Sequence, residues 1–233
     1  KNNNPNWIIN CGAYTNVEKA EKEKKLAFSI NSEAPFTFAK ALKINGGNLI
    51  HISSDYVFDG QINFPYPPSF KTSPISTYGK SKELGEKKIL EYKKIKNKFF
   101  ILRTSWLISK YGNNFLSKML SLHKSKDFIN VVSDQFGCTT SCHSLSYICW
   151  QLIQKEESEN HEGLRSPEIL HWCDSGITSW FDVAIAIGEI GKELGLLKKQ
   201  AEIIPTITSE YKTLAKRPSF SLLNCKSTFN LLS

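Results

Sequence analysis

Short apolar runs alternate with longer segments of mixed polarity in the first half of the chain. Three runs have the length and composition of buried strands: residues 7–13, 48–54 and 99–103. Three further segments carry apolar residues three to four positions apart, which predicts helices: residues 17–30, 34–42 and 77–94. Strands that alternate with helices in this way predict an α/β fold, a doubly wound parallel sheet with helices on both faces.

The alternation becomes less regular after about residue 128. The remaining segments predict strands at 129–132 and 169–172 and helices at 145–154 and 178–194, around a polar loop at 156–166. We therefore expect a smaller C-terminal lobe, and we place the division between residues 1–128 and 129–233. No repeat or low-complexity linker marks a sharper boundary.

The composition is that of a globular protein, with 40% hydrophobic and 22% charged residues. A formal net charge of +8 raises the question of nucleic-acid binding. Among the 30 basic residues the only arginines are Arg103, Arg165 and Arg217, although recognition of bases and phosphates favours arginine. Much of the lysine alternates with glutamate or apolar residues, as on a solvated helix face. We therefore expect no nucleic-acid partner.

Neither a membrane nor a metal is expected. The chain has no uninterrupted apolar stretch near the roughly 20 residues that cross a bilayer, and it starts with polar residues. We expect a soluble, cytoplasmic protein. The six cysteines form no Cys-x-x-Cys pair, and the nearest approach to a metal pattern, Cys138, Cys142 and His143, has no second ligand cluster. We expect no zinc site and no disulfide framework.

Candidate chemistry lies where predicted strands end, since doubly wound sheets bind ligands beyond the carboxyl ends of their strands. Ser54 ends one predicted strand, and Tyr78 and Lys82 lie four residues apart on the helix that follows. A tyrosine has a pKa near 10, which a neighbouring ammonium lowers. We expect Lys82 to lower the pKa of Tyr78, and Tyr78 to give its proton to a carbonyl that Ser54 orients.

Taken alone, Tyr-x-x-x-Lys occurs by chance on many exposed helices. Here it follows Ser-Ser-Asp-Tyr-Val-Phe-Asp-Gly at 53–60 and a proline-containing loop, the order found in short-chain dehydrogenases. Further segments resemble dTDP-4-dehydrorhamnose reductases, an extended family of that type. They match in the same order over nearly the whole chain: residues 10–15, 50–60, 78–82, 102–106, 112–115, 134–137, 178–180 and 215–218.

The resemblance implies a role for individual residues. Ser54, Tyr78 and Lys82 would be catalytic. The cofactor, NADPH or NADH, would be bound by Gly12, Ala13, Tyr14, Thr15, Asn31, Ser53, Tyr78 and Lys82. The dTDP-sugar substrate would be bound by Ser54, Asp55, Tyr56, Trp106 and Arg217. The family likeness leaves Mg²⁺ dependence and a homodimer open.

Each site residue has a plainer interpretation. Trp106 could be a core residue, Asp55 could cap the following turn, Tyr14 could pack between strands, and Arg217 could hold the final loop. The sequence also departs from the family at Cys138-Thr139-Thr140, where a small residue and a proline usually precede the threonine.

A complete member of this family starts with a strand, a Gly-x-x-Gly-x-x-Gly turn and a helix, which receive the cofactor pyrophosphate. This chain shows no such segment, because Gly46 and Gly47 precede a strand. We therefore expect residues 1–128 to be an incomplete, Rossmann-like dinucleotide-binding domain and 129–233 to be mainly a substrate-binding lobe.

The function implied is reduction of dTDP-4-dehydro-6-deoxy-L-mannose to dTDP-L-rhamnose, for cell-surface polysaccharide. Two alternatives stay open. One is a different sugar-nucleotide reductase or epimerase, because the three catalytic residues specify carbonyl chemistry and not the hexose. The other is a non-catalytic, nucleotide-binding regulatory subunit, because a fold can outlast its activity.

Overall fold

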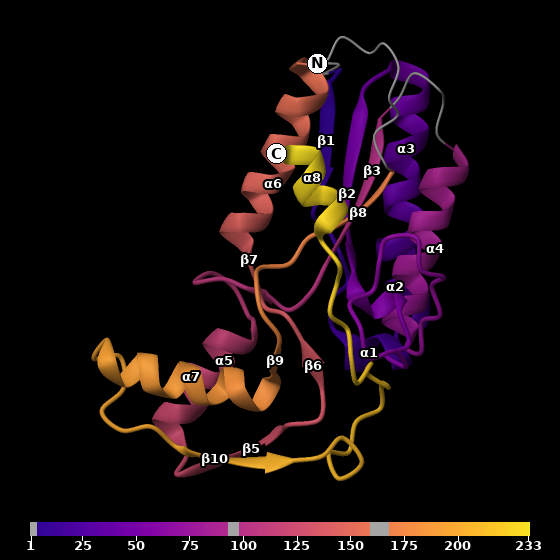
Figure 1. Cartoon of the computed structure of the whole chain (residues 1–233). Coiled ribbons are helices and arrows are strands. Elements are labelled where there is room, and N and C mark those ends of the chain that lie inside the picture. The colour runs from indigo at the N-terminus through magenta and orange to yellow at the C-terminus, as the bar shows by residue number, and fades with distance from the viewer. Residues whose placement is uncertain (1–3, 93–97, 159–167) are drawn as a thin grey trace.

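A four-stranded parallel sheet forms the centre of the larger layer in the computed structural model, which describes residues 4–92, 98–158 and 168–233 (Figure 1). The strand order is β1-β2-β3-β8. The strands are β1 (Trp7–Asn10), β2 (Asn48–Ser54), β3 (Phe99–Thr104) and β8 (Ile169–His171). All three pairings are parallel, so the carboxyl ends of the strands lie at one edge.

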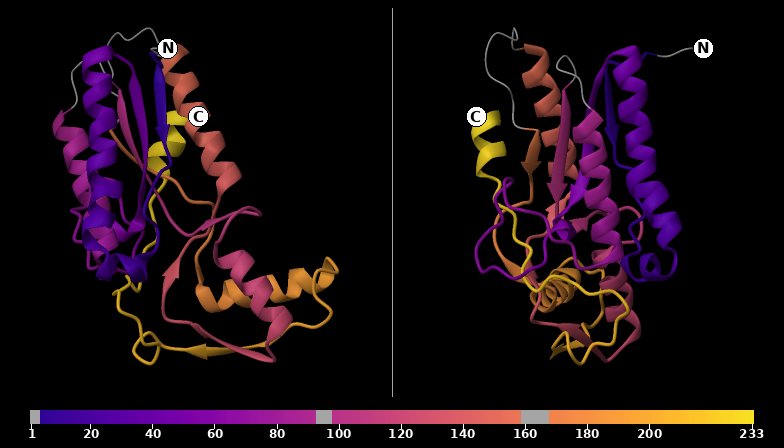
Figure 2. Two further views of the ribbon diagram at one scale, coloured as in Figure 1. Left: turned by 180° about the vertical axis from the view of Figure 1, so that it is seen from behind. Right: turned by 90° about the vertical axis from the view of Figure 1, so that its right-hand side faces the viewer.

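Helices cover both faces of this sheet, as expected for a doubly wound fold (Figure 2). Side chains alternate along each strand, so Leu49 and Ile101 pack under α3 (Ala34–Asn45) and α4 (Thr77–Tyr92). Ile50 and Leu102 point the other way, against α6 (Cys142–Ser158) and the end of α8 (Lys226–Leu232). The prediction of an α/β fold with a parallel sheet is confirmed.

The helix predicted at 17–30 is interrupted. Two short helices, α1 (Val17–Lys22) and α2 (Lys24–Phe28), are separated at Glu23, whose backbone is not helical. A π-helical turn (Ser29–Glu33) then leads from α2 into α3. This turn lies so close to α4 that a Cβ on Gly85 would come within 2.2 Å of the Asn31 carbonyl oxygen. The wider turn therefore lets Asn31 point inward at a point where two backbones meet.

A second, smaller layer lies below the sheet in Figure 1. Its helices are α5 (Phe115–Ser125) and α7 (Trp180–Glu193), and its parallel strands are β5 (Phe128–Val132) and β10 (Glu202–Thr206). Met119, Ile129 and Ala184 are central to its core. Short strand pairs join the layers: β4 (Leu107–Ile108) with β7 (Thr140–Ser141), and β6 (Phe136–Gly137) with β9 (Thr178–Ser179).

Chain segments cross between the layers more than once. The helices α6 and α8 and the strand β8 follow residue 128 and belong to the large sheet, whereas α5 precedes it and belongs to the small layer. The division of the chain at residue 128 stays a prediction. Most of the loop predicted at 156–166, with Arg165, and the last two residues of the helix predicted at 77–94 lie outside the described residues. No described helix is long and apolar enough to span a membrane.

Candidate active site

The end of β2 and the start of α4 meet at Ser54, Tyr78 and Lys82. The Ser54 hydroxyl lies close enough to the Tyr78 phenol to lower its pKa. Lys82 follows one helical turn later, and its ammonium donates to the Ile52 carbonyl over 2.7 Å. The approach requires a glycine at position 79, because a Cβ there would lie 2.2 Å from the Tyr56 carbonyl oxygen. The three residues predicted from the sequence therefore lie at one edge of the sheet.

The electrostatics of Tyr78 differ from our prediction. Burial raises the pKa of Tyr78 to about 12, although the Ser54 hydroxyl lowers it. The expectation that Lys82 lowers the pKa of Tyr78 was wrong for this arrangement, because Lys82 is not among the groups that shift that pKa and its ammonium donates to the Ile52 carbonyl. Tyr78 consequently keeps its proton at neutral pH, as a proton donor must.

A chain of polar groups leads from the loop after β1 to Lys82. The Gly12 amide donates to Asn10 Oδ1 over 3.1 Å, so the other end of that side chain, Nδ2, faces His51 Nδ1 at 2.9 Å. Assigned from this network, the neutral imidazole carries its proton on Nε2, which lies 3.4 Å from Lys82 Nζ. Burial holds the pKa of His51 well below its ordinary value and lowers the pKa of Lys82 to about 8. Sequence reasoning missed Asn10 and His51, although both lie in motifs that it quoted.

The loop at 12–15 is held by Asn31, which is fully buried. The Asn31 amide accepts from the Tyr14 backbone N–H over 2.8 Å and donates to the Tyr14 carbonyl and to Ser81 Oγ. Its amide therefore fixes the loop against α4. Ala13 and Thr15 lie in the same loop, and the Tyr14 hydroxyl donates to Glu23 over 2.6 Å. Cofactor contacts of these residues stay predictions.

Ser53 lies on the opposite face of β2 from Ser54. Its hydroxyl donates to the buried carboxylate of Glu86, which forms an ion pair with Arg103 at 2.7 Å. Arg103 also donates from Nε to Glu86 over 3.0 Å. Ser53 thus belongs to a buried ion-pair network behind the site, and its predicted role in cofactor binding stays a prediction.

Asp55 follows directly after β2 in a short 3-10 helix (Asp55–Val57) and is buried. Its Oδ1 accepts from the Ser54 hydroxyl over 3.0 Å, whereas its buried Oδ2 has no hydrogen-bond partner among the described residues, and the nearby Ser221 hydroxyl lowers its pKa. Burial raises the pKa of Asp55, and the neighbouring hydroxyls lower it. The effect of burial is larger, so the pKa rises to about 6. A carboxylate this close to Tyr78 can accept hydrogen bonds from a bound hydroxyl-rich ligand.

Tyr56 and Arg217 form the wall between the two layers. The Tyr56 ring meets the Tyr78 ring edge to face, with centroids 5.4 Å apart. Arg217 is a hydrogen-bond partner of the Tyr56 hydroxyl and forms an ion pair with Glu18 at 2.6 Å. Burial raises the pKa of Tyr56, so this phenol also stays neutral.

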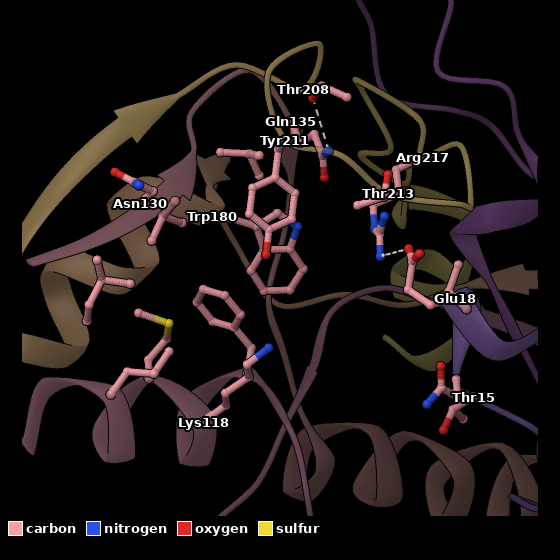
Figure 3. Close-up of a pocket in the computed structure, with 18 of the residues that line it drawn as sticks. Thr15, Glu18, Lys118, Asn130, Gln135, Trp180, Thr208, Tyr211, Thr213 and Arg217 are labelled. Carbon is pink, nitrogen blue, oxygen red and sulfur yellow. Dashed lines mark hydrogen bonds and ion pairs between the residues drawn. The ribbon is translucent and has the colours of Figure 1, made fainter. Parts of the chain in front are cut away.

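A cavity of about 480 Å³ opens beside this wall (Figure 3). Thr15, Tyr56 and Arg217 line it from the large layer and the segment that leads back to that layer, and further lining residues are Lys118, Gln135, Trp180, Thr208 and Tyr211. Figure 3 shows the Tyr211 and Trp180 side chains over the middle of the cavity and Lys118 below them. Sequence reasoning quoted the segment that contains Trp180 but did not assign this residue to the site.

Trp106 lies behind Trp180. Their rings stack with centroids 3.7 Å apart, and the other face of Trp106 meets Gly137, where a Cβ would lie 2.8 Å from the indole. Trp106 has a backbone φ of 44°, a left-handed conformation that is costly for a bulky residue. The structure therefore holds Trp106 in a slot, and its predicted contact with substrate stays a prediction.

Comparison with known proteins identifies the family. The model of the RmlD substrate binding domain matches residues 1–232. A dTDP-4-dehydrorhamnose reductase of Sinorhizobium fredii is 38% identical over 221 residues, which are 95% of this chain and 72% of that protein. The chain belongs to the dTDP-4-dehydrorhamnose reductase family.

Two more members of this family are similar to the chain. The Escherichia coli K12 dTDP-4-dehydrorhamnose reductase is 35% identical, over 94% of this chain and 71% of its own. The crystal structure of the Bacillus anthracis enzyme in complex with NADP superposes with a TM-score of 0.83 at 36% identity, covering 95% of this chain and 73% of that one. The family resemblance predicted from the ordered motifs is confirmed.

One departure from the dTDP-4-dehydrorhamnose reductase pattern is accommodated locally. In the Cys138-Thr139-Thr140 segment, the Cys138 carbonyl accepts from Ser105 over 2.7 Å, and Thr140 is fully buried beside Thr104. The segment thus stays attached to the end of β3 without a proline. Within the three described ranges, no group of three or more histidine, cysteine or acidic side chains is arranged to hold a metal ion.

Proposed function

We propose that this protein reduces the C4 ketone of dTDP-4-dehydro-6-deoxy-L-mannose to dTDP-L-rhamnose with NADPH or NADH. The observation that carries the proposal is the meeting of Ser54, Tyr78 and Lys82 at the carboxyl edge of the sheet, in a chain of this family. The named relatives are dTDP-4-dehydrorhamnose reductases, and one of them was crystallised with NADP. A cytoplasmic location and a homodimer remain predictions.

The residues at this edge fit a nicotinamide cofactor. Lys82 has three ammonium hydrogens and, in the part of the chain that the structure describes, one acceptor, the Ile52 carbonyl, because His51 Nε2 carries a proton. A further hydrogen is therefore available for a ribose hydroxyl. Gly12 lies in the exposed loop beyond β1, where a backbone can approach a ligand closely. The cofactor, when bound, supplies the hydride.

Each catalytic residue then has one task. Tyr78 holds a proton at neutral pH because of its burial and donates it to the ketone oxygen. Ser54 turns its single hydroxyl hydrogen from the Asp55 carboxylate to the same oxygen and orients it. His51 faces Lys82 with its Nε2 proton and so offers the ammonium no acceptor, which leaves the Ile52 carbonyl as its hydrogen-bond partner.

The cavity between the layers suits the nucleotide part of the substrate. Arg217 and Lys118 place two cations at its wall, where they can attract a diphosphate. Trp180 and Tyr211 supply flat apolar faces for a base or a sugar. Asp55 and Tyr56 lie between this cavity and Tyr78, so a sugar linked to the nucleotide would reach the phenol past them.

Replacing Tyr78 by Phe in the full-length protein tests the proposal. The variant should lose about 100-fold or more in turnover, because the proton donor is absent, while calorimetric titration with NADPH should change little. Tyr92→Phe removes a hydroxyl from the other end of the same helix and should keep full turnover.

Unchanged turnover of Tyr78→Phe would refute the catalytic assignment. Product analysis with several dTDP-sugars would separate this substrate from those of another sugar-nucleotide reductase or epimerase. Failure of the native full-length protein to bind NADPH would favour the regulatory subunit.

A further inference from the structure

Three cysteines that are distant in the sequence converge beyond the end of β8. Cys173 lies two residues after that strand, Cys225 directly precedes α8, and Cys138 follows β6. The three belong to one buried cluster. Cys173 Sγ and Cys225 Sγ are 3.6 Å apart, although the residues are 52 positions apart in the chain. The reaction described above uses none of these thiols.

The cluster is accessible from the surface. A hollow lies on this side of the molecule, and both Cys173 and Cys225 form part of its wall, together with Lys226 and Phe229 at the start of α8. Cys225 is partly exposed, whereas Cys138 and Cys173 are buried. A reagent the size of water or peroxide can therefore reach the sulfur pair without unfolding the chain.

The thiols of Cys173 and Cys225 can share a hydrogen bond with either one as the donor, whereas the Cys138 thiol donates to the Asp174 carbonyl over 2.9 Å. With Cys138 nearby and Cys225 as the donor, the pKa of the Cys173 thiol is lowered and the pKa of Cys225 is raised. The Cys173 backbone N–H donates in turn to Cys225 Sγ over 3.2 Å. Cys173 is thus the nucleophile of the cluster, since the thiolate is the reactive form of cysteine.

We propose that Cys173 and Cys225 are an oxidation site that forms a reversible intramolecular disulfide with peroxide. The Cys173 thiolate attacks one peroxide oxygen and becomes a sulfenic acid, releasing one water after protonation. The Cys225 sulfur then attacks Cys173 Sγ and releases the second water. Two electrons pass from the dithiol to the peroxide, and each thiol loses one hydrogen. The sulfurs need to approach from 3.6 Å to about 2.0 Å to form the bond.

The disulfide would fix the segment that runs from the active site to α8. Ser221 in this segment lies near the Asp55 carboxylate, and Ser219 donates to the Gly60 carbonyl. The segment ends at Cys225 and continues directly into α8. This helix packs on β8 and lies beside α6 (Figure 1). A covalent link to Cys173 therefore ties the Ser221 segment to the large sheet. The link forms whether or not the protein is a reductase, so the inference stands apart from the proposed function.

Differential alkylation of the full-length protein tests the site. After treatment with hydrogen peroxide, denaturation and alkylation, peptide mass spectrometry should find Cys173 and Cys225 joined, with the loss of two hydrogens. The crosslink closes a long loop, so Tm should rise by about 10 °C, and dithiothreitol should reverse this rise.

Two variants make the result specific. Cys225→Ser should abolish both the crosslink and the rise in Tm, whereas Cys142→Ser, at an exposed position elsewhere, should keep both. The proposal fails if Cys173 and Cys225 are alkylated after peroxide as they are before it. It also fails if Cys173 pairs with Cys138, or if it is oxidised to sulfinic acid while Cys225 stays free.

Discussion

Two buried carboxylates lie within the same layer in opposite electrostatic environments. Glu86 on α4 has Arg103 at 2.7 Å and the Ser53 hydroxyl as partners. Asp55, directly after β2, accepts from the Ser54 hydroxyl and lies near the Ser221 hydroxyl, and its Oδ2 has no hydrogen-bond partner among the described residues. Both acids are about 2% exposed. Burial alone therefore does not decide what a carboxylate does.

The difference separates a structural acid from the acid that we propose contacts the substrate. A buried carboxylate with a bidentate guanidinium partner holds two elements together, here α4 and β3. A buried carboxylate with only hydroxyl partners is costly to ionise, which is why the pKa of Asp55 rises to about 6. A protein tolerates such a cost where a ligand needs the charge, and Asp55 lies beside Tyr78.

The largest expected effect comes from breaking the structural pair. Glu86→Gln should lower the free energy of unfolding by about 3–5 kcal/mol, because the Arg103 guanidinium stays buried without its anion. Urea denaturation at pH 7 measures the change.

Two further variants sharpen this prediction. Glu91→Gln, on the exposed side of the same helix, should change the free energy of unfolding by less than about 0.5 kcal/mol. The double variant with Arg103→Met should lose less than the sum of both single losses. Additive losses would show that Glu86 and Arg103 do not act as a pair.

Replacing Asp55 should change the free energy of unfolding by an intermediate amount and in the opposite direction to Glu86→Gln. Because the pKa of Asp55 is raised from 3.8 to about 6, the folded protein binds more protons than the unfolded chain between about pH 4 and 6. The contribution of Asp55 to stability is therefore lost as pH rises through this window. Asp55→Asn should remove that loss and raise the free energy of unfolding at pH 7 by on the order of 2 kcal/mol, while KM for the dTDP-sugar increases.

Asp182 is the matched control. It caps α7 with Ser179, and these hydrogen bonds lower its pKa, so its contribution is present at neutral pH and lost on acidification. Asp182→Asn should therefore destabilise the protein at pH 7 by about 1 kcal/mol. If Asp55→Asn also destabilises at pH 7, Asp55 is a structural residue and the contrast with Glu86 is lost.

The smallest effect is expected at the half-exposed pair of Glu18 and Arg217. Their atoms are as close as those of the buried pair, 2.6 Å, but the side chains are 36% and 22% exposed. Glu18→Gln should lower the free energy of unfolding by less than about 1 kcal/mol, because solvent screens the pair. A loss as large as that of Glu86→Gln, in the same denaturation assay, would show that distance and not burial sets the strength of these pairs.

Local pattern predicted the elements of the sheet well, because strands buried on both faces contain compact apolar runs. The segments at 48–54 and 99–103 are β2 and β3 with at most one residue added. The segment at 17–30 was wrongly predicted as one continuous helix. The structure has a break at Glu23 and a π-helical turn where the chain comes close to α4 at Gly85. A tertiary contact of that kind leaves no periodic signal.

The residues of the candidate site also fall into those that the sequence predicted and those that it did not. Ser54, Tyr78 and Lys82 were predicted because they are attached to the ends of one strand and one helix. Trp180 and the other small-layer residues of the cavity were not assigned, because only the packing of α7 against α5 brings them opposite Arg217.

The amino-acid sequence determined which segments are strands and helices, which family they belong to, and which side chains can transfer a proton. Those properties depend on residue type, spacing and order. The tertiary structure decided the protonation of these groups and their neighbours: Tyr78 keeps its proton, Asp55 resists ionisation, and Cys173 meets Cys225. The reason is physical, since a pKa and a sulfur–sulfur distance depend on what surrounds a group in space, and those surroundings come from distant parts of the chain.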